Sequence, residues 1–488
     1  MKLLGLRLCA HDSNISYFDG NTVQYLKTER IFQHKHHFVG ALNVWDQIIK
    51  NIWGVDINDL DEICIILDPW KYGFDASQDN FFPSKNFDDF GLKCKVTRLN
   101  HHYAHHLSCW PLIKNPHNFN GITIDGYGDW DKAWTVFKDK KIYEEGSTYK
   151  YGSIGQWMGD IGKETFKMKG HGLDIAGKLM SLQSYGKVDT QFLNYLKQFD
   201  LYDVHHIFSI ARYTHKIITP EDLNNWLRTV HEHVGLVLLN FFKKIFSKEE
   251  IFLYTGGVAL NVTWNTLLKK HFKNIIIPPH TNDDGLSLGA LEFLRIKHNL
   301  PHFKLNNFPF CQTDESPQKS PNQALIEKTV DLLKKQKIIG WYQGHGEIGP
   351  RALGNRSILA DPRDKEMRHK VNKIKKREQF RPFGCSTIED EFSNSEYMLL
   401  AETLKTKKYP AIKHIDNTCR HQKVNFNGPF LQLLNEFKNI TDCGTLLNTS
   451  LNVDGKPLAS YKRDALSILE NSELDGLVYG NQLYLKEN

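Results

Sequence analysis

A run of histidines near residue 100 contains the side chains of this sequence best suited to bind a metal ion. His101 and His105 lie four positions apart, as do His102 and His106, so each pair would share one face of a helix. A carboxylate from the turn Asn282–Gly285 would complete either site. Two histidines and one carboxylate leave coordination positions open and suit Fe(II), Mn or Zn. A solvated, histidine-rich helix end is the alternative, and the spacing leaves both open.

Three glycine-containing segments are candidates for a nucleotide site. Thr255–Asn261 follows a short apolar strand and precedes a helical pattern, so its backbone amides could hold a phosphate. Asp125–Asp129 is a second glycine-rich turn, and Gly177–Lys178 is a third candidate turn that adds a basic residue. Each alone is typical of an ordinary turn, whereas the three together favour a nucleotide site. The candidate residues are Asp125, Gly126, Gly128, Lys178, Gly256, Gly257 and Asn261.

Arginines and lysines concentrate in the C-terminal part of the chain. Arg351 and Arg356 lie among glycines, and Arg377 and Arg381 follow. Guanidinium groups bind phosphate and carboxylate oxygens through paired hydrogen bonds. Residues 363–381 contain nine basic and three acidic residues, an excess of six that equals the net charge of the whole chain, +6. The stretch could be a solvated basic helix, a phosphate-substrate pocket or a polyanion-binding face.

The elements expected to position these residues repeat one plan of strand, polar turn and hairpin. The first copy has predicted strands over 3–9, 15–18 and 22–26, and the second over 122–124 and 133–137 plus a third strand. This pattern suggests an internal duplication, although two unrelated hairpins would also produce it. Duplicated units of this kind build the ATP-binding fold of actin and the sugar kinases. A helix over 223–244 and a buried strand over 251–254 follow.

Composition restricts the class of protein. The 488 residues are 40% hydrophobic, which excludes a disordered chain or a small disulfide scaffold. No apolar run reaches the ~18 to 20 residues of a membrane span, and the N-terminus does not resemble a signal peptide. The eight cysteines are widely spaced, as in proteins with free thiols, so we expect a cytoplasmic location. A proline-rich polar stretch predicts domains over 1–310 and 326–488, joined by a linker over 311–325.

Taken together, these segments resemble the O-carbamoyltransferase family that includes the nodulation-factor, cephamycin and tobramycin carbamoyltransferases. The matching segments span nearly the whole chain. They are Ala10–Ser13, His101–His105, Asp125–Asp129, Gly177–Met180, Gly256–Asn261, Asp283–Ala290, His345–Arg363, Arg377–Phe383, His414–Gln422 and Asn448–Asn452.

The resemblance implies an α/β enzyme with an actin-like (ASKHA) N-terminal domain and a YrdC-like C-terminal domain. The C-terminal domain would make carbamoyl-adenylate from carbamoyl phosphate and ATP, with Mg for the ATP step. The N-terminal domain would bind a metal, expected to be Fe(II), through His101, His105 and Asp283, and pass the carbamoyl group to an acceptor hydroxyl. His11 would be the base, with Asp12 beside it. Contacts to carbamoyl phosphate and ATP would come from Arg351, Arg356, Lys376, Arg377, Arg381, Arg420, Asn448 and Ser450.

Two other functions fit parts of the pattern: a sugar kinase or ATPase on the actin-like fold, and a nucleic-acid-binding protein without catalysis. The acceptor hydroxyl could belong to a small molecule. It could also be the hydroxymethyl group of a modified pyrimidine, free or in DNA, because the basic excess and the exposed-looking Trp130, Trp134 and Trp157 would suit a nucleotide.

Overall fold

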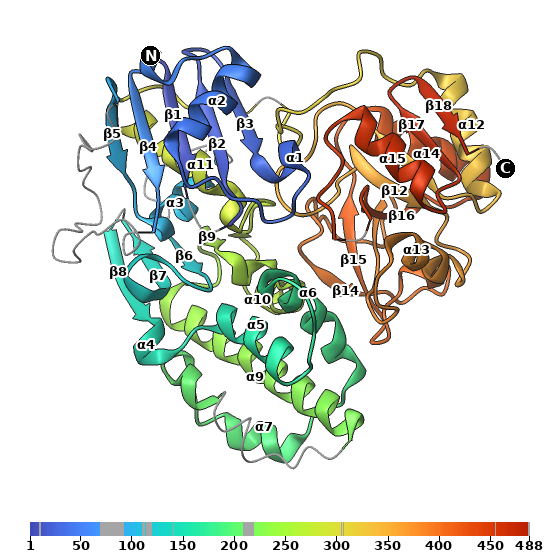
Figure 1. The fold of residues 1–488 in the computed structure, drawn as a ribbon. Helices are drawn as coiled ribbons and strands as arrows, with labels where there is room; N and C mark the ends of the chain where they lie inside the picture. Colours follow the sequence, from blue (N-terminus) through green and yellow to red (C-terminus); the bar gives the residue numbers. More distant parts are fainter. Residues whose placement is uncertain are drawn as a thin grey trace.

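The protein contains three β-sheets in the computed structural model (Figure 1). The described residues are 1–8, 11–68, 92–109, 113, 120–139, 141–207, 219–303, 305, 307–453 and 455–486. Two of the sheets lie one above the other on the left of Figure 1, and the third forms the C-terminal part on the right. The candidate functional residues lie where these three parts meet.

The two N-terminal sheets have the same topology. The first has the order β3-β2-β1-β4-β5 and the second, read in the same direction, β8-β7-β6-β9-β10. In each, an antiparallel hairpin unit is followed by strands parallel to its first strand. The strands are β1 (Leu3–Arg7), β2 (Asn14–Phe18), β3 (Val23–Lys27), β4 (Glu62–Ile66), β5 (Lys95–Arg98), β6 (Asn120–Ile124), β7 (Lys132–Lys138), β8 (Lys141–Ser147), β9 (Phe252–Thr255) and β10 (Ile275–Ile276). The predicted duplication is confirmed.

Two helices pack against each other between these sheets. Helix α11 (Leu286–Lys297) contacts β1, β2 and β4, while α3 (His101–Ser108) contacts β6 and β9. The helices approach closely because Gly289 has no side chain, and a Cβ there would collide with the carbonyl oxygen of Ala104. This packing brings the histidine run on α3 close to the turn that precedes α11.

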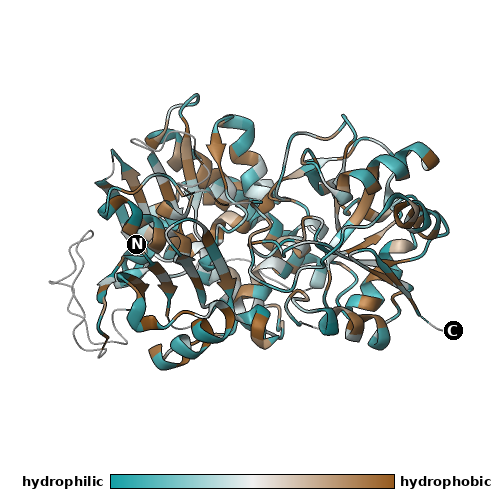
Figure 2. Ribbon diagram, turned by 90° about the horizontal axis from the view of Figure 1, so that it is seen from above, coloured by the Kyte–Doolittle hydropathy of each residue, from teal (hydrophilic) through white to brown (hydrophobic). Residues whose placement is uncertain are grey.

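The outer face of each sheet is covered by further helices, and their apolar residues form the brown interior of Figure 2. Helix α2 (Leu42–Trp53) covers the first sheet. The second is covered by α5 (Ile154–Glu164), α6 (Gly172–Leu182), α9 (Pro220–Ile245) and α10 (Val262–His271). Helix α9 confirms the helix predicted over 223–244. None of the helices in the described ranges is both long and apolar enough to cross a membrane.

Two expectations from the sequence are wrong here. Trp134 and Trp157 are buried, with 1% and 4% of their surface exposed, because they fill the core between β7, α5 and α9. They therefore offer no surface for stacking a base. Gly177–Lys178 does not form a turn but lies within α6, whose apolar residue Leu179 packs into the same core.

The third sheet has eight strands in the order β14-β15-β13-β16-β12-β11-β17-β18. They are β11 (Ile339–Tyr342), β12 (Arg356–Ala360), β13 (Gly384–Thr387), β14 (Ala401–Thr403), β15 (Thr418–Lys423), β16 (Thr445–Ser450), β17 (Gly476–Tyr479) and β18 (Gln482–Leu485). Helices α12 (Gln323–Lys334), α14 (Pro429–Thr441) and α15 (Lys462–Asn471) pack on it, and its own apolar core runs from Leu325 to Tyr479. The YrdC-like assignment and the linker over 311–325 stay predictions.

The remaining helices are short and connect the parts. They are α1 (Thr28–Phe32), α4 (Thr148–Tyr151), α7 (Thr190–Leu196) and α13 (Met367–Lys375). Seven cysteines carry free thiols, as predicted, and Cys9 lies outside the described residues.

Candidate active site

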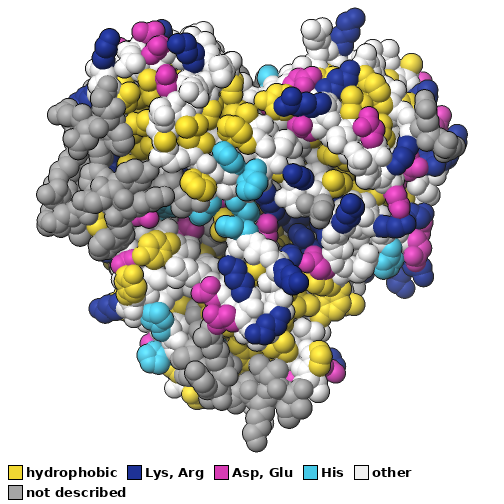
Figure 3. Space-filling model, viewed as in Figure 1, with side chains coloured by type: hydrophobic (Ala, Val, Ile, Leu, Met, Phe, Trp, Pro, Cys, Tyr) yellow, Lys and Arg dark blue, Asp and Glu magenta, His cyan; other side chains and the backbone are white. Residues whose placement is uncertain are grey.

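A cavity of about 1010 Å³ lies at the junction of the three sheets. Figure 3 shows histidines and basic side chains facing each other at this junction. Most of the residues predicted from the sequence line the cavity: His11, Asp12, His101, Asp125, Gly126, Gly128, Lys178, Gly257, Asn261, Asp283, Arg351, Lys376, Arg377, Arg381, Arg420, Asn448 and Ser450. His105, Gly256 and Arg356 are not among the lining residues.

One end of the cavity contains a set of four groups that can hold a metal ion. Helix α3 begins at the Asn100 cap, whose side chain accepts a hydrogen bond from the Tyr103 amide, and this places His101 and His105 on one face. Their Nε2 atoms lie 3.4 and 3.3 Å from Oδ1 of Asp283. Asp125 joins them, with Oδ2 2.9 Å from Nε2 of His105. All four donor atoms lie within 4.8 Å of one another.

Asp125 is a candidate ligand that sequence reasoning missed, because it was assigned to the nucleotide turn. Its position at the end of β6 was visible in the sequence, but its proximity to α3 was not. The structure also separates the two histidine pairs. His102 turns into the core, where its Nδ1 is 2.8 Å from Thr135 Oγ1, and the His106 ring stacks on Phe137.

The electrostatics of this set fit a bound cation. Burial alone would raise the pKa of Asp283, but His101 and Arg7 hold it well below its usual range. Burial would lower the pKa of His101, yet Asp283 and Asp125 raise it to about 9. The carboxylates of Asp283, which is buried, and Asp125, which is half-buried, therefore hold positive charge between them, and a divalent ion could replace that charge. Imidazole nitrogens and carboxylate oxygens suit Fe(II), Mn or Zn, and nothing in the donor set selects among them.

His11 lies beside this set, just after β1. Its Nδ1 is 3.0 Å from Asp12 Oδ2 and 3.7 Å from Asp283 Oδ2, and 29% of its side chain is exposed. Asp12 is also 2.9 Å from Lys27 Nζ, and although burial alone would raise its pKa, the Lys27 charge and hydrogen bonds to His11 and His36 hold it well below its usual range. An ionised Asp12 can hold the imidazole in one orientation, as a general base requires.

Asp12, Glu29 and His36 also converge closely enough to suggest a second metal group. Lys27 already occupies this cluster, with Nζ 3.2 Å from Glu29 and close to Asp12 and Asp284. The ammonium neutralises the carboxylates, so the cluster supports the shape of the loop rather than binding a metal.

The glycine segment after β9 has a more limited role than predicted. Gly256 has φ +90°, and a Cβ there would collide with the Ile124 carbonyl. Its amide donates to Thr281 O at 2.8 Å, so it is already engaged. The Asn261 side chain caps α10 and contacts His231 Nε2 at 3.0 Å. Lys178 is also engaged, because its Nζ is 2.6 Å from Glu378.

The other end of the cavity holds a cluster of cations, in which Lys375 is buried and the arginines are half-buried. Burial, followed by repulsion from neighbouring arginines, lowers the pKa of Arg351 and Arg377 well below the usual range. Burial also lowers the pKa of Arg420 to about 10. Glu378 is the acid in ion-pair range here, 3.6 Å from Arg381. Such a cluster is an electrostatic match for a polyanion.

Lys375 belongs to this cluster and was missed by sequence reasoning, which selected Lys376. Lys375 ends α13 and is buried, with Nζ donating to Asn452 O at 2.7 Å, whereas Lys376 is exposed. Burial, then repulsion from Arg377 and Arg381, lowers the pKa of Lys375 well below its usual range. Both lysines line the cavity, and they differ in burial.

Arg356 is placed away from the cavity, contrary to its predicted contact with substrate. It is fully buried on β12 and stacks 3.5 Å above the Tyr342 ring. Its guanidinium donates to Asp314 at 2.9 Å and to the carbonyl oxygens of Gln343 and Ala459 at 2.6 and 3.1 Å. With its donors engaged in this way, Arg356 stabilises the fold of the C-terminal part.

Comparison with known proteins agrees with this arrangement. The model for the carbamoyltransferase N-terminus matches residues 85–291, and that for the carbamoyltransferase C-terminus matches residues 330–486. The chain belongs to the carbamoyltransferase family. The residues of the metal-type set lie in the first matched range, and those of the cation cluster lie in the second.

Its relatives include nodulation protein NolNO of Sinorhizobium fredii, 27% identical over 452 residues, or 82% of this chain and 65% of NolNO. The 3'-hydroxymethylcephem-O-carbamoyltransferase of Amycolatopsis lactamdurans is 30% identical over 248 residues, 47% of this chain and 48% of that protein. This carbamoyltransferase therefore spans less than two thirds of either relative. Among solved structures, T. kodakarensis HypF aligns at 15% identity and TM-score 0.39, over 62% of this chain and 48% of HypF.

Proposed function

We propose that the protein is an ATP-dependent O-carbamoyltransferase that works in two half-reactions. Carbamoyl phosphate, ATP and water form carbamoyl-adenylate, pyrophosphate and phosphate, and the carbamoyl group then passes to an acceptor hydroxyl. The observation that carries this proposal is the single cavity, which has a cation cluster at one end and a base beside a metal-type set at the other.

The cation cluster suits the first half-reaction. Carbamoyl phosphate and the ATP triphosphate are both polyanionic, and Mg would accompany the ATP. Desolvation lowers the pKa of Arg351, Lys375, Arg377 and Arg420, and the charge of Arg381 lowers each of them further, so a bound polyanion would relieve this repulsion. Asn448 and Ser450 line the same end and can add neutral hydrogen bonds. A YrdC-like C-terminal domain, bounded by a linker over 311–325, is part of this proposal.

The other end suits transfer to a hydroxyl. His11, oriented by Asp12 at 3.0 Å, can take the proton of an acceptor hydroxyl. A positioned base of this type contributes typically ~10²- to 10⁴-fold to the rate. When bound to the four-residue set, a metal, for which we favour Fe(II), would supply positive charge to the adenylate phosphate and carbonyl. AMP is the leaving group, and it makes the carbamoyl carbon far more reactive than that of a simple carbamate.

A continuous cavity fits the chemistry of the intermediate. Carbamoyl-adenylate is a mixed anhydride that water destroys, so transfer within one enclosed space conserves it. Hydrogen bonds between the parts border the cavity: Gln33, at the end of α1, donates through Nε2 to the cavity-lining Leu458 O at 3.3 Å. From the second sheet's side, Ser184 donates to Asp416 at 2.8 Å.

For the acceptor we favour a small molecule that carries a primary alcohol. The related cephem enzyme is named for a hydroxymethyl acceptor, and that group suits a base such as His11. A hydroxymethylated pyrimidine carries the same alcohol, but the burial of Trp134 and Trp157 removes two of the aromatics that favoured it. Mass spectrometry of both acceptor types, after incubation with ATP and carbamoyl phosphate, distinguishes them by the carbamoyl mass gain.

The two half-reactions can be tested separately with His11→Ala. We expect carbamoyl-phosphate-dependent exchange of labelled pyrophosphate into ATP in both the wild-type protein and the variant, because His11 lies outside the cation cluster. Transfer to the acceptor should fall by ~10²- to 10⁴-fold in the variant alone. Transfer by His11→Ala at the wild-type rate would contradict the role of His11. Release of ADP instead of AMP would point to a sugar kinase or ATPase.

A further inference from the structure

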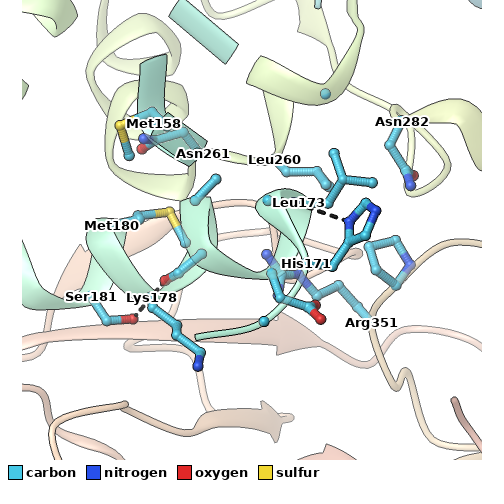
Figure 4. Close-up of a pocket in the computed structure, with 18 of the residues that line it drawn as sticks. Met158, His171, Leu173, Lys178, Met180, Ser181, Leu260, Asn261, Asn282 and Arg351 are labelled. Atoms are coloured by element: carbon cyan, nitrogen blue, oxygen red, sulfur yellow. Dashed lines mark hydrogen bonds between the residues drawn. The ribbon is translucent and has the colours of Figure 1, made fainter. Parts of the chain in front are cut away.

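The ring of His171 lies beside His11 and was not among the residues expected to take part in the reaction. His171 lines the cavity at the start of α6, and Figure 4 shows its ring hydrogen-bonded to Leu173. The His11 and His171 ring centroids are 6.2 Å apart, with the rings inclined at 65°. Two imidazoles therefore meet edge to face in the cavity, next to the metal-type set.

The hydrogen bonding of His171 fixes which of its nitrogens can donate. The Leu173 amide donates to Nδ1 of His171 at 3.4 Å, which caps α6. A nitrogen that accepts carries no proton, so in the neutral ring the proton lies on Nε2. Burial, then the charges of His36 and His11, lower the pKa of His171 and keep the ring neutral. His171 therefore offers one N–H donor.

The orientation of the His171 ring is fixed by its neighbour His36. The two rings stack with centroids 4.5 Å apart and an interplanar angle of 25°. His36 is itself held by Asp12 at 3.1 Å and by Asp174, on the first turn of α6, at 3.6 Å. Helix α6 thus contacts His36 through both His171 and Asp174. His36 in turn contacts Asp12, which contacts His11.

We propose that His171 is a further catalytic residue, whose Nε2–H donates a hydrogen bond to the carbamoyl oxygen of the adenylate. This inference rests on the proposed function. The acceptor oxygen bonds to the carbamoyl carbon while its proton passes to His11. The bond from that carbon to the bridging oxygen then breaks, and AMP leaves with the electron pair. Negative charge develops on the carbamoyl oxygen during attack, and a fixed donor there stabilises the transition state.

The separation of the two rings is compatible with this role. The ring centroids are 6.2 Å apart and both residues line the cavity, so one carbamoyl group bound there could contact both rings from the same side. The base would contact the acceptor side of the reacting carbon, and His171 its carbonyl side.

The test uses a stable probe and two variants. The probe is the adenosine 5'-ester of phosphonoacetamide, in which a CH₂ replaces the scissile oxygen of carbamoyl-adenylate. His171→Asn keeps a side chain that caps helices well but loses the ring donor. His171→Gln brings an amide donor near the position of Nε2. We expect His171→Asn to bind the probe ~10-fold more weakly by calorimetry, with an unchanged Tm, and His171→Gln to recover most of the affinity.

A merely structural His171 would give a different result, because His171→Asn keeps the cap and would then bind the probe as the wild-type protein does. Pyrophosphate–ATP exchange on the same preparations separates this outcome from failure of the proposed function. Two results would overturn the role of His171 alone, provided that exchange is normal. One is equal affinity for the probe in all three proteins, and the other is no binding of the probe to the wild-type protein. Absence of carbamoyl-phosphate-dependent exchange in the wild-type protein overturns the proposed function and the inference with it.

Discussion

The two histidine pairs on α3 provide a matched experiment on the metal-type set. His102 and His105 are both buried on the same helix, with 1% and 0% exposure. Replacing either with Ala removes a buried ring and should destabilise the metal-free protein to a similar extent, ~1 to 3 kcal/mol. Only His105 contributes to the four-residue set, whereas His102 contacts Thr135. The variants should therefore differ in metal binding and not in folding.

The magnitude follows from ligand-linked stability. A metal present at 100 times its Kd stabilises the folded state by about 2.7 kcal/mol. Mutation of a group that only hydrogen-bonds to a metal ligand typically weakens metal affinity by ~10- to 100-fold, so loss of one of the four donors should weaken it by at least ~100-fold. At the same metal concentration the stabilisation of His105→Ala then falls to about 0.4 kcal/mol. His102→Ala should retain the full effect.

The assay is chemical unfolding of each protein with and without Fe(II), Mn(II) or Zn(II), with the bound metal counted by mass spectrometry. We expect about one metal ion per chain for the wild-type protein and His102→Ala, and little for His105→Ala. Equal loss in both variants, or equal retention, would refute the assignment of the ligand face of α3.

Three further predictions concern the cation cluster, the C-terminal core and the His36 loop. Lys375→Met should weaken pyrophosphate binding, measured by calorimetry, by ~10-fold or more. The control is Lys373→Met, which should leave this affinity unchanged because Lys373 is exposed and pairs with Glu473. Arg356→Met should lower the stability of the fold by about 3 to 5 kcal/mol, since buried acceptors lose their donor, and a normal Tm would contradict this. Burial would lower the pKa of His36, but bonds to Asp12 and Asp174 raise it from 6.5 to about 9. The contribution of the protonated His36 ring to the free energy of unfolding is then complete below pH 6.5 and is lost as the pH rises through 9. His36→Gln should remove about 2 to 3 kcal/mol of this pH dependence, measured by urea unfolding across that range.

Local patterns in the sequence were sufficient to predict much of the architecture. Alternating apolar residues and polar turns predicted the hairpin units of both N-terminal sheets and β9, but not β4, β5 or β10, and the repeated spacing predicted the duplication. The i, i+4 histidines indicated that His101 and His105 would share one face of a helix, because periodicity within one helix does not depend on the rest of the fold.

The sequence did not predict features that depend on how distant segments pack. Asp125 reaches the metal-type set only because β6 lies beside α3. Lys375 joins Lys376 at the cavity, and it is the buried one of the two because it lies on the inner face of the last turn of α13. Arg356 lies on a strand buried between two others, and its neighbours in sequence gave no sign of that. His171 becomes a neighbour of His11 only when α6 folds across the cavity.

The central claim is that this protein activates carbamoyl phosphate by adenylation before it transfers the carbamoyl group. The most direct measurement is chromatographic analysis of the nucleotide products from ATP, with and without carbamoyl phosphate. The proposal predicts AMP and pyrophosphate in equal amounts, formed only when carbamoyl phosphate is present. Formation of ADP, or AMP formation that does not depend on carbamoyl phosphate, would contradict it.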